Sequence, residues 1–159
     1  MNKYENAIKL MQERCGNADK DNFITLTTVA LTPNATGNPR PTVRIVNAYY
    51  ENGVFYVSTG ASKNKTAEIA KCNEVVIGGL NGFAFHGVAE NLGWVKEEKN
   101  VEIRSNMKKV FEWFADEGGE DSPDSIVLKI TLTSGNIFDS EKKYGEWLYT
   151  VDFANKTAE

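Results

Sequence analysis

The stretch Thr42–Lys65, TVRIVNAYYENGVFYVSTGASKNK, decides the fold. Its two apolar runs are rich in the β-branched and aromatic residues that favour strands. Glu51-Asn52-Gly53 separates them, and an Asn-Gly pair between such runs is the strongest short hairpin signal. The stretch therefore predicts antiparallel strands over Pro41–Tyr50 and Val54–Ser58, followed by a polar turn that leads into a helix.

The sequence on either side continues this pattern. Turn-forming pairs separate further runs of strand-forming residues, and apolar positions at helical spacing indicate amphipathic helices between them. The expected further strands are Phe23–Leu31, Glu74–Leu80, Phe83–Leu92, Ser125–Thr133 and Asn136–Ser140, with the last two forming a final hairpin over Ser134-Gly135. The expected helices are Asn2–Arg14, Lys63–Cys72 with Ser62 as its N-cap, and Lys96–Ala115 with Gly118-Gly119 beyond its end.

This order of elements predicts a mainly β fold. Six or seven strands in mostly hairpin order, interrupted by helices, favour a closed or partly closed antiparallel barrel with helices packed at its ends. A doubly wound α/β fold is disfavoured because helices do not alternate regularly with strands. Nothing in the chain marks a linker or a repeat, so we expect a single domain over residues 1–159.

Bulk composition narrows the function classes. The net charge of −4 argues against general nucleic-acid binding, which needs clustered Lys and Arg. We expect no membrane segment, because no apolar run approaches the ~20 residues that span a bilayer. The N-terminus lacks the apolar core of a secretory signal, so we expect a cytoplasmic protein. Cys15 and Cys72 show no metal-ligand or redox spacing, which predicts two reduced, mostly buried thiols and no metal site.

Charge distribution points to a small anionic ligand. Between residues 39 and 80 the chain carries five basic and three acidic residues, within an otherwise acidic chain. Ser62, Lys63 and Lys65 lie where a strand meets a helix, and free amides and the dipole at a helix N-terminus attract phosphate. Arg44 lies inside an apolar strand, where a charge must meet an anion, a carboxylate or solvent. The alternatives are a solvated basic turn and an exposed strand arginine.

Catalytic side chains are harder to find. His86 is the only histidine, and its alternating strand GFAFHGVAE favours a structural or solvent-facing role. The sequence shows no Ser/His/Asp set and no spaced carboxylate pair, which argues against a hydrolase or a metal enzyme. We therefore assign no catalytic residue.

The order of these motifs resembles the pyridoxamine 5′-phosphate oxidase-like family of FMN-binding split barrels. The similarity is carried by Thr42–Asn47, Val54–Thr59 and Ser62–Lys65. Gly87–Glu90, Phe111–Phe114 and the segment from Asp121 to Ile130 resemble the general-stress-protein branch. The resemblance implies a six- to seven-stranded antiparallel split β-barrel and a homodimer whose subunits both line each flavin cleft.

The resemblance also implies which residues hold the flavin. Arg44 with Lys63 or Lys65 would contact the phosphate, and Ser62 and Thr59 would donate hydrogen bonds to it. Backbone groups of Ile45, Val46, Asn47, Val57 and Ser58 would face the ribityl chain and the ring. The oxidase's C-terminal Trp/Arg segment has no counterpart here, because the tail from Tyr144 to Phe153 lacks arginine.

The leading hypothesis is an FMN-dependent oxidoreductase that reduces a small molecule with NAD(P)H as electron donor. In flavoproteins the flavin performs the redox chemistry while protein groups orient and tune it. The alternatives are a non-catalytic FMN-binding or stress-related sensor, and a barrel that binds another phosphorylated or haem-like ligand. The sequence does not distinguish FMN from a deazaflavin, and it leaves the substrate open.

Overall fold

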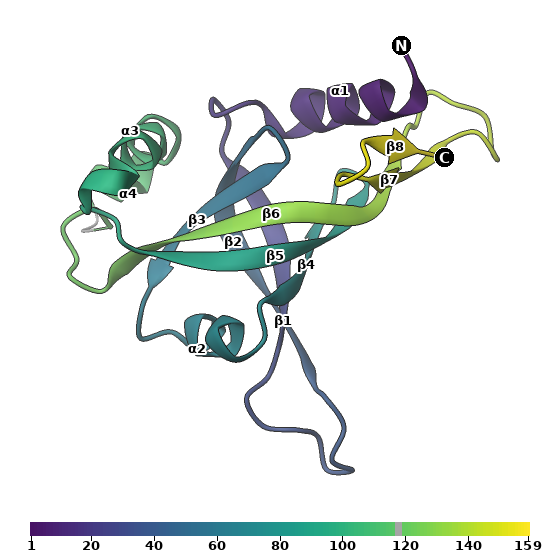
Figure 1. The fold of residues 1–159 in the computed structure, drawn as a ribbon. Coiled ribbons are helices and arrows are strands. Elements are labelled where there is room, and N and C mark those ends of the chain that lie inside the picture. Colours follow the sequence, from purple (N-terminus) through teal and green to yellow (C-terminus); the bar gives the residue numbers. More distant parts are fainter. Residues whose placement is uncertain (117–118) are drawn as a thin grey trace.

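Six antiparallel strands close into a barrel in the computed structural model, which describes residues 1–116 and 119–159 (Figure 1). The sheet order is β3-β2-β1-β4-β5-β6, and β3 also pairs with β6 to complete the ring. The strands are β1 (Asn22–Val29), β2 (Pro41–Glu51), β3 (Val54–Gly60), β4 (Glu74–Gly79), β5 (Phe83–Trp94) and β6 (Ser125–Phe138). The mainly β, antiparallel barrel prediction is thus confirmed.

Two helices cover opposite ends of the barrel (Figure 1). Helix α1 (Lys3–Cys15) buries Ala7, Met11 and Cys15 against the barrel core. Helix α2 (Asn64–Lys71) packs at the other end, where it contacts β1 and β5. Both cysteines are free thiols, and burial raises the pKa of Cys15 to about 11. Within the described residues, no helix is long and apolar enough to cross a membrane.

The single helix predicted over Lys96–Ala115 is instead three short pieces. They are the 3-10 turn η1 (Glu98–Asn100), α3 (Val101–Val110) and α4 (Glu112–Asp116). Phe111 interrupts the helix in an extended conformation and is completely buried. It packs with Tyr49, Met107 and Phe114 in a second apolar cluster on the outer surface of the barrel. Tertiary packing thus overrides helical spacing here, and the predicted Gly118 lies outside the described residues.

The predicted hairpin over Ser134-Gly135 is wrong. Residues 125–138 form one long strand, β6, which pairs with β5 from Phe83↔Ile137 to Trp94↔Ile126. Gly135 serves close packing, since a Cβ there would lie 2.3 Å from the carbonyl oxygen of Ala84. A Ser-Gly pair that reads as a turn is therefore a point of close strand approach.

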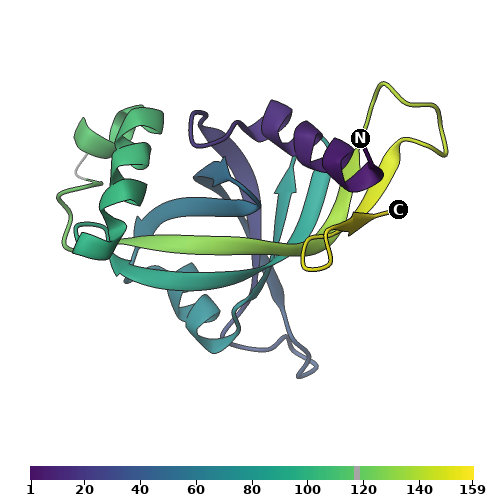
Figure 2. The same ribbon diagram turned by 45° about the horizontal axis from the view of Figure 1, so that its top comes forward.

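Two further strands extend the sheet beyond the barrel. They are β7 (Leu148–Asp152), which pairs with the end of β6, and β8 (Thr157–Ala158), which pairs with β7. Sequence reasoning missed both. Figure 2 shows this extension and the α3–α4 pair at opposite ends of the long strands β5 and β6.

The alternation of β2 sets the geometry of the site. Val46, Ala48 and Tyr50 point into the barrel and are buried in its core. Val43 and Ile45 point outward and are 62% and 70% exposed. Because successive side chains alternate, Arg44 belongs to the inward set, at the end of the barrel that α2 covers.

Candidate anion-binding site

Strands β2 and β3 separate partway along their length, beside the N-terminus of α2. Their ladder joins Ala48↔Val57 to Glu51↔Val54 and ends there. Beyond it, β3 follows β6 and β2 follows β1, with Gly60 opposite Ser125 and Arg44 opposite Leu26. The facing edges of Ile45–Asn47 and Ser58–Thr59 therefore lie outside the β2–β3 ladder.

An open concavity of about 400 Å³ lies between Arg44 on β2 and the start of α2. Arg44, Ser62, Lys63, Asn64 and Lys65 line it. The structure therefore brings Arg44 from β2, Lys63 from the turn after β3 and Lys65 from the first turn of α2 to the same hollow. Ser62, Lys63 and Asn64 are exposed in this turn.

Arg44 is held by a carboxylate that the sequence analysis missed. Its Nη2 lies 2.8 Å from Oε2 of Glu68 on α2, and their side chains are 20% and 7% exposed. The Arg44 Nη1 donates to Oγ1 of Thr28 at 2.5 Å, and Thr28 also donates to Glu68. An exposed strand arginine is therefore wrong as a description. A single charge in an apolar strand could have indicated this pair, because a buried arginine needs an acidic partner on an element packed against the strand.

Lys65 lies partly buried at the edge of the concavity. Its Nζ donates to Oγ1 of Thr59 at 2.9 Å. Partial burial, followed by the nearby charges of Arg44 and Lys63, lowers the pKa of Lys65 below its ordinary value, while Glu68 acts in the opposite direction. A bound anion would offset the unfavourable surroundings of the charged Lys65 side chain.

Ser62 is committed to a second carboxylate. The Ser62 amide donates to Oδ1 of Asp124 at 3.0 Å, and its hydroxyl donates to Oδ2 at 2.7 Å. Ser62 is also not the N-cap of α2, a position that Lys63 occupies without a capping side-chain hydrogen bond. The Asp124 carboxylate thus takes the hydroxyl that was expected to cap the helix.

The other residues implied by the family resemblance have varied surroundings. Val46 and Val57 are core residues, and Ile45 projects from the outer surface. The Oγ of Ser58 lies 3.3 Å from Oγ of Ser125. Asn47 accepts a hydrogen bond from Nε1 of Trp113 at 2.9 Å and donates to Asp21. The backbone edges of Ile45–Asn47 and Ser58 lie outside the β2–β3 ladder, whereas Val57 pairs with Ala48 within it.

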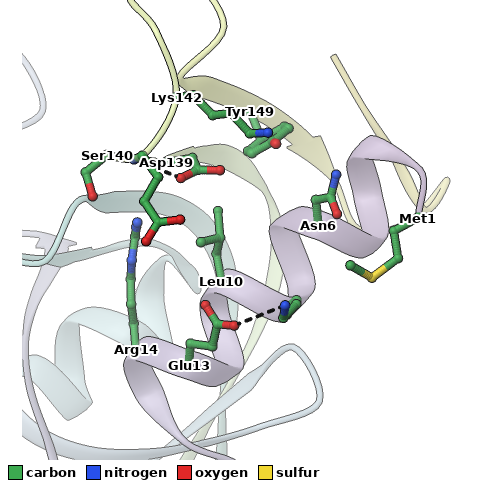
Figure 3. A pocket seen from close by; sticks show the side chains of 11 residues that line it. Met1, Asn6, Leu10, Glu13, Arg14, Asp139, Ser140, Lys142 and Tyr149 are labelled. Atoms are coloured by element: carbon green, nitrogen blue, oxygen red, sulfur yellow. Dashed lines mark hydrogen bonds and ion pairs between the residues drawn. The ribbon is translucent and has the colours of Figure 1, made fainter.

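A second cavity of about 400 Å³ lies between α1 and residues 139–142 (Figure 3). Arg14 there donates to the carbonyl oxygens of Gly82 and Phe138, and Lys9 pairs with Glu13 at 3.5 Å. Asp139 and Glu141 add negative charge to its lining. This cavity is thus less suited to an anion than the concavity at Arg44.

Solved structures share this arrangement of strands. A Clostridium acetobutylicum protein related to general stress protein 26, of the pyridoxinephosphate oxidase family, matches 97% of this chain and 96% of its own. The TM-score is 0.61, at 16% identity. The chain has the fold of the pyridoxamine 5′-phosphate oxidase-like split barrels. We call the separation of β2 and β3 the split.

Two further solved structures with a similar fold carry names that describe different functions. A candidate pyridoxamine 5′-phosphate oxidase from Listeria innocua matches 86% of this chain and 98% of its own, with TM-score 0.59 and 20% identity. HutZ, a heme storage protein of Vibrio cholerae, matches 83% and 91%, with TM-score 0.58 and 16% identity. No protein-family model and no curated protein sequence matches the chain. At these identities the split-barrel likeness establishes the fold and leaves the ligand open.

Proposed function

We propose that this protein binds FMN at the split between β2 and β3 and acts as an FMN-dependent oxidoreductase on a small molecule. The observation that carries the proposal is the convergence of Arg44, Lys63 and Lys65 on one concavity. In an acidic chain, such a cluster is best explained by a dianionic group such as a phosphate monoester.

The chemistry of these residues fits the phosphate. Arg44 is fixed in orientation by Glu68 and Thr28, so little side-chain freedom remains to be lost on binding. Lys63 and Lys65 supply further charged donors, and the N-terminus of α2 contributes a favourable dipole. Phosphate binding would also favour the protonated form of Lys65, whose pKa is lowered by burial and by the other cations.

The rest of a flavin would extend along the split. Backbone groups of Ile45–Asn47 and Ser58–Thr59 outside the β2–β3 ladder offer donors and acceptors to a ribityl chain and ring. Bound FMN would supply hydride transfer, with NAD(P)H as donor and a small electron-poor molecule as acceptor. The residues described here bind and orient, and none is assigned a proton-transfer role.

A second copy of the chain would complete the site. Phe23 on β1 is 73% exposed, and it lies on the same outer surface of the sheet as the exposed residues Val43 and Ile45. Apolar side chains gathered on one sheet surface mark an interaction surface. A homodimer formed there would cover the split and shield a flavin ring from water.

Ile45→Glu should convert the dimer to monomer, because it buries an unpaired charge in the apolar contact. Light scattering after size exclusion at micromolar concentration measures this. Val101→Glu is a matched control, since Val101 is also an exposed apolar residue, at 55%, and belongs to helix α3 and not to the β1–β2 sheet. A monomeric wild type, or an Ile45→Glu protein that remains dimeric, would show that this surface is not the contact.

The decisive test of function is a comparison of FMN, riboflavin, a deazaflavin and haemin. FMN should bind more tightly than riboflavin, because only FMN carries the phosphate, and the complex should show flavin absorbance bands. Preference for haemin, or equal binding of FMN and riboflavin, would overturn the proposal. Anaerobic addition of NAD(P)H should then bleach the bound flavin. Persistent colour would indicate a flavin-binding sensor in place of an enzyme.

A further inference from the structure

The carboxylate of Asp124 already accepts hydrogen bonds from the turn between β3 and α2, which lines the concavity. Asp124, one residue before β6, accepts hydrogen bonds from both the amide and the hydroxyl of Ser62, at 3.0 and 2.7 Å. The Ala61 amide donates to the backbone oxygen of Asp124 at 2.7 Å. Two consecutive residues of the turn are thus joined to this aspartate.

The local sequence accommodates this carboxylate closely. A Cβ at Gly60 would lie 2.4 Å from Oδ2 of Asp124 and 3.1 Å from Cγ of Lys63. Any other residue at position 60 would displace the carboxylate or the turn. Glycine therefore allows the backbone of the turn to close around Asp124, directly beside the lysines of the concavity.

We propose that Asp124 is a built-in counter-anion that limits the affinity of the site for a phosphate monoester, so that bound FMN exchanges with the solution. This inference rests on the proposed function. Asp124 withdraws both Ser62 donors from the ligand and places a fixed negative charge beside the turn that holds Lys63 and Lys65. The phosphate is then bound by the three cations and the dipole at the N-terminus of α2, without the two Ser62 donors.

The charge balance of the concavity supports this role. Arg44, Lys63 and Lys65 bring three positive charges to the concavity. Glu68 pairs with Arg44, and Asp124 adds a second negative charge through its hydrogen bonds to Ser62, next to Lys63 in the chain. Glu68 serves to orient Arg44. Asp124 contacts the turn instead, at the donors that a phosphate would otherwise use.

Asp124→Asn is the direct test, because asparagine keeps an acceptor for the Ser62 amide, removes the charge, and replaces the acceptor of the Ser62 hydroxyl with an amide donor. We expect FMN to bind about tenfold more tightly, the size of a unit-charge interaction in a water-accessible site. Riboflavin affinity should not change. FMN should also be retained longer during dialysis. Asp121→Asn is the control, since Asp121 is an exposed aspartate three residues earlier whose partner is Lys96.

Ser62→Ala supplies a second measurement. With its hydroxyl committed to Asp124, its loss should leave FMN affinity within about twofold of the wild type. A clear loss of affinity would mean that Ser62 contacts the phosphate, and the inference would be wrong.

The outcomes separate the two proposals. Equal binding of FMN and riboflavin in the wild type and in Asp124→Asn would overturn the proposed function. A wild type that prefers FMN, with no gain in Asp124→Asn beyond that in Asp121→Asn, would overturn the counter-anion role alone. A gain confined to Asp124→Asn and to FMN supports it.

Discussion

Replacing Lys63 and Lys65 together by alanine should weaken FMN binding by more than about 100-fold. Hydrogen bonds to charged groups contribute about 1.5–3 kcal/mol each, and the double variant removes two donors from one concavity. Arg44 would remain, so residual binding is expected. Isothermal titration or quenching of flavin fluorescence measures the change.

Two comparisons make this result specific. Riboflavin affinity should be unaffected, because the lysines act on the phosphate. The double variant Lys142→Ala with Lys143→Ala removes the same charge from an exposed loop and should leave FMN binding nearly unchanged. Equal losses in the two double variants would mean that only the net charge matters, and the concavity would not be the phosphate site.

Glu68→Leu should lower the free energy of unfolding by about 3 kcal/mol, since removing one partner of a buried ion pair leaves the other uncompensated. The remaining Arg44 side chain is only 20% exposed, and the buried Thr28 hydroxyl would also lose its acceptor. Urea unfolding followed by circular dichroism measures the loss.

A double variant, Glu68→Leu with Arg44→Met, tests whether the loss comes from the unpaired arginine. Replacing both charges by apolar groups of similar size should recover much of the stability, because buried pairs contribute little net stabilisation. This double variant should still lose FMN affinity, since Arg44 belongs to the proposed phosphate site. Similar stabilities of wild type and Glu68→Leu would show that the pair is solvated and does not anchor Arg44.

The strands of the barrel could be predicted from local sequence because each is a run of strand-forming residues bounded by a turn. The Asn52-Gly53 and Asn81-Gly82 hairpins both form as expected, with Gly53 and Gly82 at positive φ. Ser134-Gly135 misled the same reasoning. Gly135 is needed because the backbone of Ala84, about 50 residues away in the chain, lies too close for a side chain. A local sequence pattern carries no information about this contact.

The basic residues of the candidate site could also be found in the sequence, but the acidic residues that contact the site could not. Arg44 and the lysines stand out by charge type in their segments. Glu68 and Asp124 are ordinary acidic residues in sequence, and only the fold places them against Arg44 and Ser62. Likewise, Trp113 on α4 reaches Asn47 on β2 across 66 positions of the chain. Interactions of this range depend on topology, so residue type alone could not have revealed them.

Closure of the barrel by β3 and β6 has a consequence for how the protein folds. Gly60 pairs opposite Ser125, so the turn that carries Lys63 meets Asp124 only when two segments more than 60 residues apart have come together. Such non-local contacts form late and slow the folding of β proteins. Ligand affinity should therefore appear in the last kinetic phase of refolding, after the early hairpins, and a nascent chain that lacks β6 would be unable to capture its ligand.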